Sequence, residues 1–202
     1  MELRDVIRDR RSIRKYKGIQ VPRGAVREII DAARLAPSGA NSQPWRFVVI
    51  RSEEKRRALR EGTVRFIADA PVIIACCVDL NAYRDVDKLS QEMFRHGMFD
   101  GVDLTTKVYD EFVRTERPLE ESALRSYCMF NSAFAIENLV LRAHDLGLGT
   151  CIAAMFNQTV IREILDLPED MVVTALIGVG YPAEDPAPRP RRDLSEILLK
   201  EI

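Results

Sequence analysis

One apolar run constrains the fold of this chain more than any other sequence feature. Every residue from Pro71 to Val78 is apolar, and several are β-branched. An alternating strand has one apolar face, whereas an unbroken run of this length is typical of a strand buried on both faces. Such a strand needs a covering layer on each side, so we predict a central sheet enclosed by helices.

A second apolar segment, Ser122–Leu146, has the length of a long helix and ends at the turn Gly147–Gly149. Its apolar residues spread over most of the helix circumference, which indicates burial on more than one side. A small chain with few strands cannot cover such a helix alone, so we expect a second copy to cover part of it. The apolar residues of this predicted helix are Phe130, Phe134, Ile136, Leu139, Val140, Leu141 and Ala143.

The remaining pattern predicts more helix than strand. Further helices are expected over 2–9, 22–36, 52–60 and 159–165, and further strands over 45–50 and 172–179, with a strand-like segment after the glycine turn. Residues 81–127 are polar and mixed in charge, with helical pieces at 89–95 and 104–113. Long connections separate the strands, which favours an α+β or mixed α/β sandwich. The 202 residues suit one domain.

Charge and cysteine usage exclude several classes of function. Thirty basic and thirty-one acidic residues leave a net charge of -1, which offers no case for nucleic acid or an anionic membrane. The N-terminus is charged from Glu2 onward, and no apolar run approaches the roughly 20 residues that span a bilayer. The cysteines show no disulfide framework, so we expect buried reduced thiols and a cytoplasmic protein. They are Cys76, Cys77, Cys128 and Cys151.

A basic stretch follows the first expected helix. Arg10, Arg11, Ser12 and Arg14 place three guanidinium groups and one hydroxyl within five residues. Arginine forks match phosphate oxygens bidentately, and a hydroxyl adds a neutral donor. A solvated charged loop remains the alternative, and taken alone the stretch does not exclude it.

A second polar segment, Ala36–Trp45, lies between an expected helix and an expected strand. It combines two prolines and a glycine with serine, asparagine and glutamine side chains. Such a loop is rigid at its prolines and offers amide and hydroxyl groups that can read the edge of a heterocycle. An ordinary helix-to-strand turn is the alternative, although the density of uncharged hydrogen-bonding groups favours a ligand loop.

Taken together, Arg10–Tyr16 and Ala36–Val49 at this separation resemble the nitroreductase family of flavin enzymes. Three later stretches agree with it, and the likeness covers roughly residues 2–80 and 128–198. The three later stretches are Glu137–Cys151, Leu176–Pro182 and the arginine cluster Arg189, Arg191 and Arg192. The resemblance implies a three-layer sandwich with a central mixed β-sheet, an intertwined homodimer, bound FMN, and a single FMN-binding domain over 1–202. Within it, 81–127 is a variable substrate-side segment and 181–202 a C-terminal arm.

The resemblance also implies which residues hold the flavin. Arg10, Arg11, Ser12 and Arg14 are expected at the phosphate, the ribityl chain and the pyrimidine edge, with Arg14 nearest the flavin O2. Pro37, Ser38, Gly39 and Asn41 are expected to come from the other subunit and line the flavin. The turn at Ala153 and Ala154 is expected to offer a backbone N–H toward flavin N5, and Arg191 and Arg192 to return to the phosphate.

The sequence departs from the family pattern in two places. Many relatives carry small glycines where this chain has Ala153–Phe156, and Met155 narrows the space beside the flavin. Some members place lysine and asparagine ahead of the second strand, but Gly62–Phe66 offers no such match. Residues 81–127 show no match either.

Other chemistries find no support in the sequence. The two histidines, His96 and His144, have no carboxylate or cysteine at metal-ligand spacing. Neither glycine pair, Gly147–Gly149 nor Gly178–Gly180, has the third glycine of a dinucleotide fingerprint. No catalytic side chain is expected, since hydride transfer through flavin N5 needs orientation more than a side-chain acid or base.

The resemblance therefore implies an enzyme that uses NAD(P)H to reduce nitroaromatics, quinones or similar electron-poor acceptors in alternating half-reactions at one FMN. Two alternatives stay open at this point. The same fold can support another flavin reaction, such as dehalogenation, heterocycle oxidation or flavin fragmentation. The chain can also hold FMN without turnover.

Overall fold

The computed structural model describes residues 1–84, 86–98, 100–101 and 120–202. Four strands form one sheet in the order β1-β2-β4-β3, namely β1 (Trp45–Ile50), β2 (Val72–Asp79), β4 (Met171–Gly180) and β3 (Gly149–Ala153). The expected strands over 45–50, 71–78 and 172–179 are confirmed. All three ladders are antiparallel. The resemblance implied a mixed sheet. Within the described residues the four strands pair only antiparallel, and the parallel contribution is an isolated bridge between Ser12 and Thr150.

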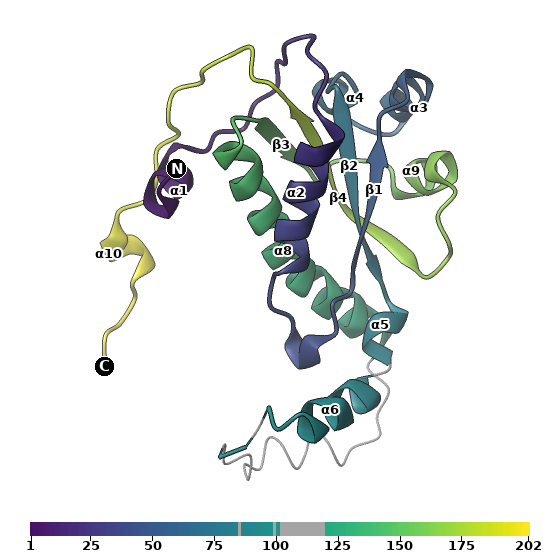
Figure 1. The fold of residues 1–202 in the computed structure, drawn as a ribbon, viewed down its shortest axis with the longest axis vertical. Helices are drawn as coiled ribbons and strands as arrows, with labels where there is room; N and C mark the ends of the chain where they lie inside the picture. Colours follow the sequence, from purple (N-terminus) through teal and green to yellow (C-terminus); the bar gives the residue numbers. More distant parts are fainter. Residues whose placement is uncertain (85, 99, 102–119) are drawn as a thin grey trace.

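Helices cover both faces of this sheet (Figure 1). On one face lie α2 (Arg23–Arg34) and α8 (Glu121–Asp145). On the other lie α3 (Glu53–Ala58), the 3₁₀ turn η2 (Leu59–Glu61), α4 (Arg65–Ala68) and α9 (Gln158–Leu165). The sheet enclosed by helices, predicted from the apolar run, and the three-layer sandwich that the resemblance implies are therefore confirmed.

The alternation of side chains along β2 explains why this strand is apolar from Val72 to Val78. Val72, Ile74 and Cys76 point into the core beneath α2 and α8. Ile73, Ala75 and Cys77 point into the opposite core beneath α4 and α9. Successive residues of a strand face opposite sides of the sheet, so a strand buried on both faces leaves no position for a polar side chain.

The remaining elements lie at the periphery. The first helix, α1 (Leu3–Asp9), packs near the C-terminal end of α8, and the 3₁₀ turn η1 (Gly39–Asn41) lies at the other end. Two helices, α5 (Asn81–Arg84) and α6 (Val86–Arg95), follow β2. The helical piece expected at 89–95 is part of α6, whereas the piece expected at 104–113 lies outside the described residues.

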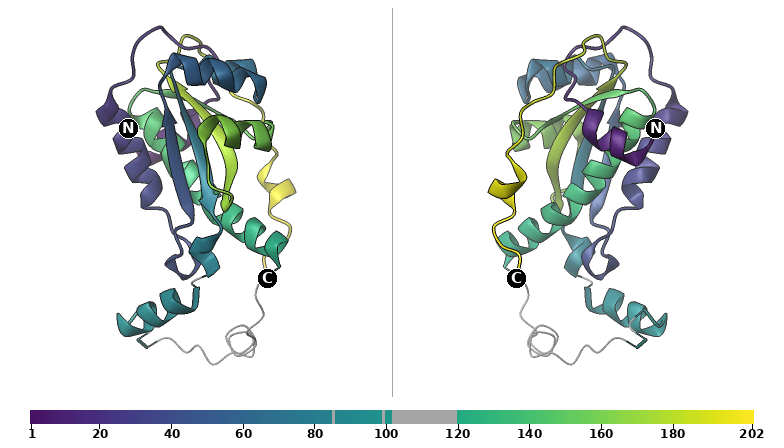
Figure 2. Two further views of the ribbon diagram at one scale, coloured as in Figure 1. Left: turned by 90° about the vertical axis from the view of Figure 1, so that its right-hand side faces the viewer. Right: turned by 90° about the vertical axis from the view of Figure 1, so that its left-hand side faces the viewer.

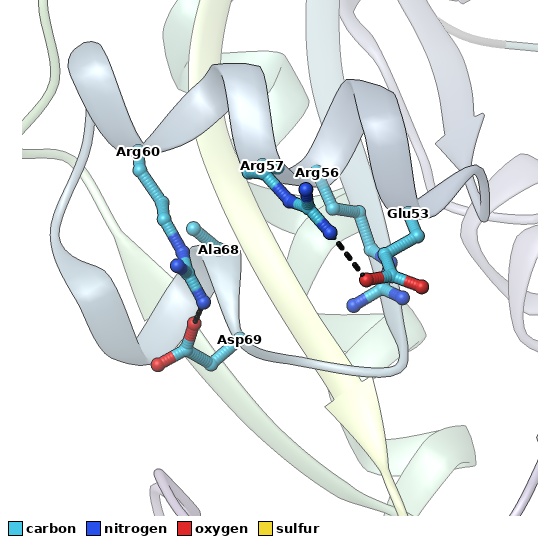
Figure 3. Close-up of a pocket in the computed structure, with 6 residues that line it drawn as sticks. All are labelled: Glu53, Arg56, Arg57, Arg60, Ala68 and Asp69. Carbon is cyan, nitrogen blue, oxygen red and sulfur yellow. Dashed lines mark hydrogen bonds and ion pairs between the residues drawn. The ribbon is translucent and has the colours of Figure 1, made fainter.

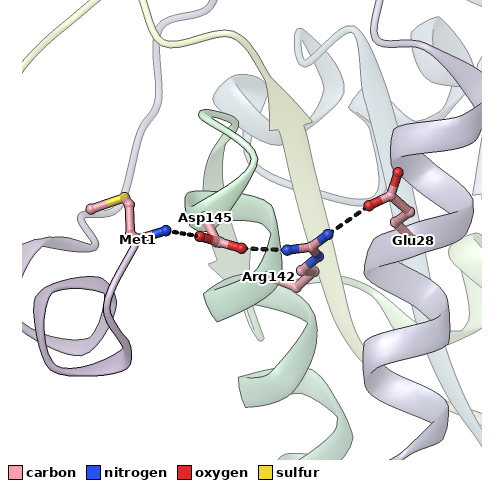
Figure 4. Close-up of polar contacts among 4 residues, drawn as sticks. All are labelled: Met1, Glu28, Arg142 and Asp145. Atoms are coloured by element: carbon pink, nitrogen blue, oxygen red, sulfur yellow. Dashed lines mark hydrogen bonds and ion pairs between the residues drawn. The ribbon is translucent and has the colours of Figure 1, made fainter.

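A chain of ion pairs joins three helices (Figure 4). The amino group of Met1 lies 2.7 Å from Asp145 Oδ1, and Arg142 of α8 pairs with both Asp145 and Glu28, the latter at 2.7 Å. These side chains are partly exposed, between 23% and 53%, so each pair contributes on the order of 0–1 kcal/mol. Their effect is to hold α1 against the C-terminal end of α8 beside α2.

All four cysteines are buried and free, as expected. Burial raises the pKa of Cys77 to about 11 and that of Cys128 to about 11, so both remain protonated thiols near neutral pH. No described helix is long and apolar enough to span a membrane.

The outer face of α8 and the C-terminal arm expose much apolar surface. Phe130 is 61% exposed and meets Phe134 edge-on, with ring centroids 4.9 Å apart. The arm extends away from the sheet and carries the short helix α10 (Leu194–Ile197), which begins at an Asp193 capping box (Figures 1 and 2). Its apolar side chains are all exposed: Leu194, Ile197, Leu198, Leu199 and Ile202.

Truncation of the core tests the enclosure of the sheet. Leu139 of α8 has no exposed surface and packs into the core against the sheet. We expect Leu139→Ala to lower the free energy of unfolding by roughly 2–5 kcal/mol, because it leaves a cavity that the helices cannot close. Urea denaturation measures this loss. The control Glu163→Ala, at an exposed position of α9, should stay within about 0.5 kcal/mol of the parent.

Candidate functional site

The basic stretch lies against the end of the sheet. After α1 the chain turns, and the amide of Ile13 donates to the carbonyl of Thr150 in β3 at 2.8 Å. Ile13 is buried over Gly149, where an added Cβ would lie 2.7 Å from the Ile13 side chain. Glycine at 149 therefore permits this close approach. As a result, Arg10–Arg14 runs beside the edge strand of the sheet.

The first residues of the C-terminal arm bracket the same stretch from the other side. The Lys17 amide donates to the Tyr181 carbonyl at 2.8 Å, and the Ala183 amide donates to the Lys15 carbonyl at 2.9 Å. The Tyr16 hydroxyl donates to the Ile13 carbonyl at 2.6 Å, and burial raises the pKa of that phenol. The stretch is thus held in one conformation by β3 and by the arm.

The cationic side chains differ in how they are held. Arg11 turns back onto the end of α1, where its Nη1 donates to the carbonyls of Arg8 at 2.7 Å and Arg10 at 2.8 Å. The Arg14 guanidinium carbon lies 5.5 Å from the ring centroid of Phe66 in α4. Arg10 is half-buried, whereas Arg14 is exposed and reaches solvent beside β3.

The end of β3 brings a second segment beside these cations. Ala153 is buried and pairs with Leu176, and Ala154 follows it as an exposed residue. Met155 is 77% exposed, so its side chain lies at the surface. The Thr63 hydroxyl contacts the Met155 carbonyl at 3.4 Å, and Thr63 bridges Phe156.

The polar loop before β1 has an unusual backbone. Ala40, Asn41 and Gln43 have φ values of 49°, 52° and 44°, in the left-handed region that few non-glycine residues adopt. The Ser38 hydroxyl accepts from the Gln43 amide at 3.0 Å. Such conformations cost of order 1–3 kcal/mol each and persist only where neighbouring structure enforces them.

That enforcement comes from α8. Asn131, which is 1% exposed, accepts from the Gly39 amide at 2.9 Å through Oδ1 and donates to the Tyr127 carbonyl at 2.9 Å through Nδ2. Gly39 lies so close to the Tyr127 ring that a Cβ would meet the hydroxyl at 1.6 Å. Sequence reasoning identified the loop but missed Asn131, because one asparagine on a helix carries no signal of its distant partner.

The two predicted binding segments lie far apart within one chain. Asn131, which holds the loop, lies near the middle of α8, whereas Asp145 marks the end at which α1 and Arg10 lie. These residues are 14 positions apart, which at 1.5 Å per residue corresponds to about 21 Å. The predicted phosphate-binding arginines of the tail, Arg191 and Arg192, are exposed. One chain therefore brings Arg10–Arg14 together with Ala153 and Ala154, but not with Pro37–Asn41.

Another arginine cluster does not form a comparable site. A surface cavity of about 430 Å³ is lined by Glu53, Arg56, Arg57, Arg60, Ala68 and Asp69 (Figure 3). Arg57 pairs with Glu53 at 2.7 Å and Arg60 with Asp69 at 2.6 Å. Because both carboxylates neutralise their neighbours, the cavity offers little net positive charge. No group of three potential metal ligands occurs among the described residues.

Comparison with known proteins identifies the family. Residues 7–181 match the model of the nitroreductase family. The chain belongs to the nitroreductase family. The match includes the basic stretch, the polar loop and the end of β3, so the resemblance stated from the motifs is confirmed.

This nitroreductase-family chain is 33% identical over 195 residues to a Thermus thermophilus protein named NADH dehydrogenase, covering 94% of this chain and 91% of the relative. A 4-nitrobenzoate reductase from Nocardioides is 28% identical, over 87% of this chain and 78% of the relative.

Solved structures share the fold of this nitroreductase-family chain. A nitroreductase family protein from Streptococcus pneumoniae has a TM-score of 0.78 at 29% identity, covering 99% of this chain and all of the other. An Exiguobacterium sibiricum protein solved in complex with FMN has a TM-score of 0.79 at 24% identity, over 98% and 96% of the two chains.

Removal of the Asn131 side chain tests the anchoring of the loop. Asn131→Ala leaves the half-buried Gly39 amide without its acceptor, so we expect the free energy of unfolding to fall by roughly 1–3 kcal/mol. Hydrogen exchange at the Gly39 amide should accelerate in the same variant. The control Ser126→Ala removes an exposed hydrogen bond within the same helix and should change neither quantity. Unchanged exchange at Gly39 would refute the anchoring role.

Proposed function

We propose that this protein is an FMN-dependent oxidoreductase that takes a hydride from NAD(P)H and delivers it to an electron-poor acceptor. One observation carries the proposal: Arg10–Arg14 is held against β3 by the Ile13 amide and the Ser12–Thr150 bridge, and β3 leads directly to the exposed Ala154. Family membership supports it. The whole chain then acts as one flavin-binding domain.

The donor set fits FMN. A phosphate monoester carries close to two negative charges near neutral pH and offers three acceptor oxygens. Arg10, Arg11 and Ser12 supply guanidinium and hydroxyl donors for it without a metal, and Arg11 exchanges its contacts to the carbonyls of α1 for the phosphate. FMN supplies the carrier of the hydride, and a cation at the pyrimidine edge stabilises the anionic reduced form. Arg14 is the residue placed for that task.

The site is proposed to be completed by a second copy of the chain. Pro37, Ser38, Gly39 and Asn41 lie where Asn131 of α8 holds Gly39, away from the Asp145 end near the arginines, so one chain does not bring both sets to the same ligand. A symmetric pair brings the loop of one subunit to the arginines of the other. The exposed Phe130–Phe134 face of α8 and the uncovered arm supply apolar surface for this homodimer.

The acceptor class follows from the relatives. One is named a 4-nitrobenzoate reductase, and another, from Methanothermobacter thermautotrophicus, is named an NADH dehydrogenase or NAD(P)H nitroreductase. We therefore propose nitroaromatics and quinones as acceptors, and NADH or NADPH as the donor. The exposed Met155 limits the size of the acceptor beside the flavin.

An absorption spectrum recorded before and after anaerobic addition of NADH tests this function. The purified protein should be yellow, release FMN on denaturation, and bleach with NADH. Aerobic turnover with a quinone or nitroaromatic should follow. A colourless protein that cannot be reconstituted with FMN would refute the cofactor, whereas bound flavin that NADH fails to bleach would indicate a carrier or another flavin reaction.

Substitution of the arginines separates specific phosphate contacts from general charge. Arg10→Ala and Arg14→Ala should each weaken FMN binding by roughly 1.5–3 kcal/mol, the range of a hydrogen bond to a charged group. Arg4→Ala removes an exposed charge from α1 and should leave the affinity unchanged. Quenching of FMN fluorescence measures all three. Equal losses would mean that only net charge matters.

Changes in the arm distinguish its two proposed roles. Deletion of residues 187–202 should weaken both FMN binding and the dimer, since it removes Arg191, Arg192 and the exposed apolar side chains of the arm. Arg192→Ala should weaken FMN binding and leave the dimer intact. Leu198→Asp should raise the dimer dissociation constant before flavin is lost. Sedimentation and flavin absorbance measure these outcomes, and a truncated protein that stays dimeric and yellow would contradict both roles.

A further inference from the structure

Arg14 of the basic stretch is held at two points. The C-terminal arm binds its backbone amide, and α4 contacts its side chain. Its amide donates to Glu184 Oε1 at 2.5 Å, and the neighbouring Lys15 amide donates to the same oxygen at 3.1 Å. Its guanidinium group lies over the Phe66 ring at 5.5 Å. Neither Glu184 nor Phe66 belongs to the motifs by which the site was predicted.

The Glu184 contact fixes the backbone of the stretch. Glu184 follows directly on the residues that pair with Lys15 and Lys17, so its carboxylate extends the bracket formed by the arm to the Arg14 amide. The two N–H groups that converge on one carboxylate oxygen form charge-assisted hydrogen bonds. They also hold the pKa of Glu184 below its ordinary value, led by the contact from the Arg14 amide, so the carboxylate stays charged near neutral pH.

The Phe66 contact fixes the side chain. Phe66 lies in α4 and packs against the core on its face of the sheet, so its ring is part of a rigid surface. A guanidinium group within about 6 Å of a ring centroid is attracted by the negative face of the ring. The Arg14 side chain is exposed, and its Nη1 also donates to the Ser12 carbonyl in a long contact of 3.4 Å. An arginine without further contacts samples many rotamers. The ring therefore restricts the guanidinium group to the space beside β3.

We propose that Glu184 and Phe66 are positioning residues that hold Arg14 ready for the pyrimidine edge of the flavin. This proposal rests on the proposed function, because it takes Arg14 as the cation at that edge. Glu184 sets where the backbone enters the site, and Phe66 sets where the charge lies. The conformational entropy of the Arg14 side chain is then already lost in the folded protein. Flavin binding and reduction therefore carry no further free-energy penalty for ordering it.

Hydrogen exchange in the flavin-free full-length protein tests the backbone half. Glu184→Ala should make the Arg14 and Lys15 amides exchange about tenfold faster, the effect of losing one charge-assisted hydrogen bond. Glu184→Gln keeps an acceptor oxygen and should stay within about threefold of the parent. Asp185→Asn removes the adjacent exposed charge and serves as the control. Unchanged exchange of the Arg14 and Lys15 amides in Glu184→Ala would overturn the positioning role of Glu184, whether or not the protein binds FMN.

The midpoint potential of bound FMN tests the side-chain half. Phe66→Leu should weaken binding of reduced flavin about tenfold more than that of oxidised flavin, which lowers a two-electron potential by about 30 mV. Phe66→Tyr keeps the ring face and should match the parent. Loss of the Arg14 charge in Arg14→Met should lower the potential at least as far.

A double-mutant cycle shows whether Phe66 acts through Arg14. If it does, Phe66→Leu should shift the potential in the parent but not in the Arg14→Met background, because the group it positions is absent. An equal shift in both backgrounds would overturn the role of Phe66, since a general disturbance of the core does not depend on Arg14. Failure of the parent protein to bind FMN would refute the proposed function instead, and the exchange experiment would still report on Glu184.

Discussion

The double-sided burial of β2 is the constraint on which the rest of the structure depends. Its side chains enter two separate cores in alternation, one beneath α2 and α8 and one beneath α4 and α9. Because both faces must be covered, helices from distant parts of the chain are drawn onto one sheet. The same arrangement places β4 and β3 beyond β2, and β3 becomes the edge strand beside which the basic stretch runs.

The basic stretch is positioned mainly by backbone contacts. Thr150 of β3 holds it on one side, and Tyr181 to Glu184 of the arm hold it on the other. Small residues make this possible, since a side chain at Gly149 would displace Ile13. The proposed cation site thus depends on three segments, one from each end of the chain and one from the sheet, and on the Phe66 ring of α4.

The distribution of the remaining surface supports the proposed homodimer. The strained loop at Ala40–Gln43 is anchored through Gly39 by Asn131 near the middle of α8, while the arginines lie near the Asp145 end of that helix. The apolar face at Phe130 and the apolar side chains of the arm are exposed in the single chain. A protein that leaves this much apolar surface exposed beside two half-sites is suited to pair with a second copy.

The sequence by itself determined the three strands at 45–50, 71–78 and 172–179, the long helix, the layered fold and the family. These features depend on local periodicity and on short motifs, which can be read without knowing any long-range contact. Only the tertiary structure decided the antiparallel sheet order and the contacts around the site.

Asn131 anchors a loop 92 positions away in the sequence, and Glu184 accepts a hydrogen bond from the Arg14 amide, 170 positions away. Phe66 meets Arg14 only because α4 and the N-terminal stretch lie at the same end of the sheet. Such partners share no pattern along the chain. Their pairing follows from how the elements pack, so no reading of one segment at a time could have found them.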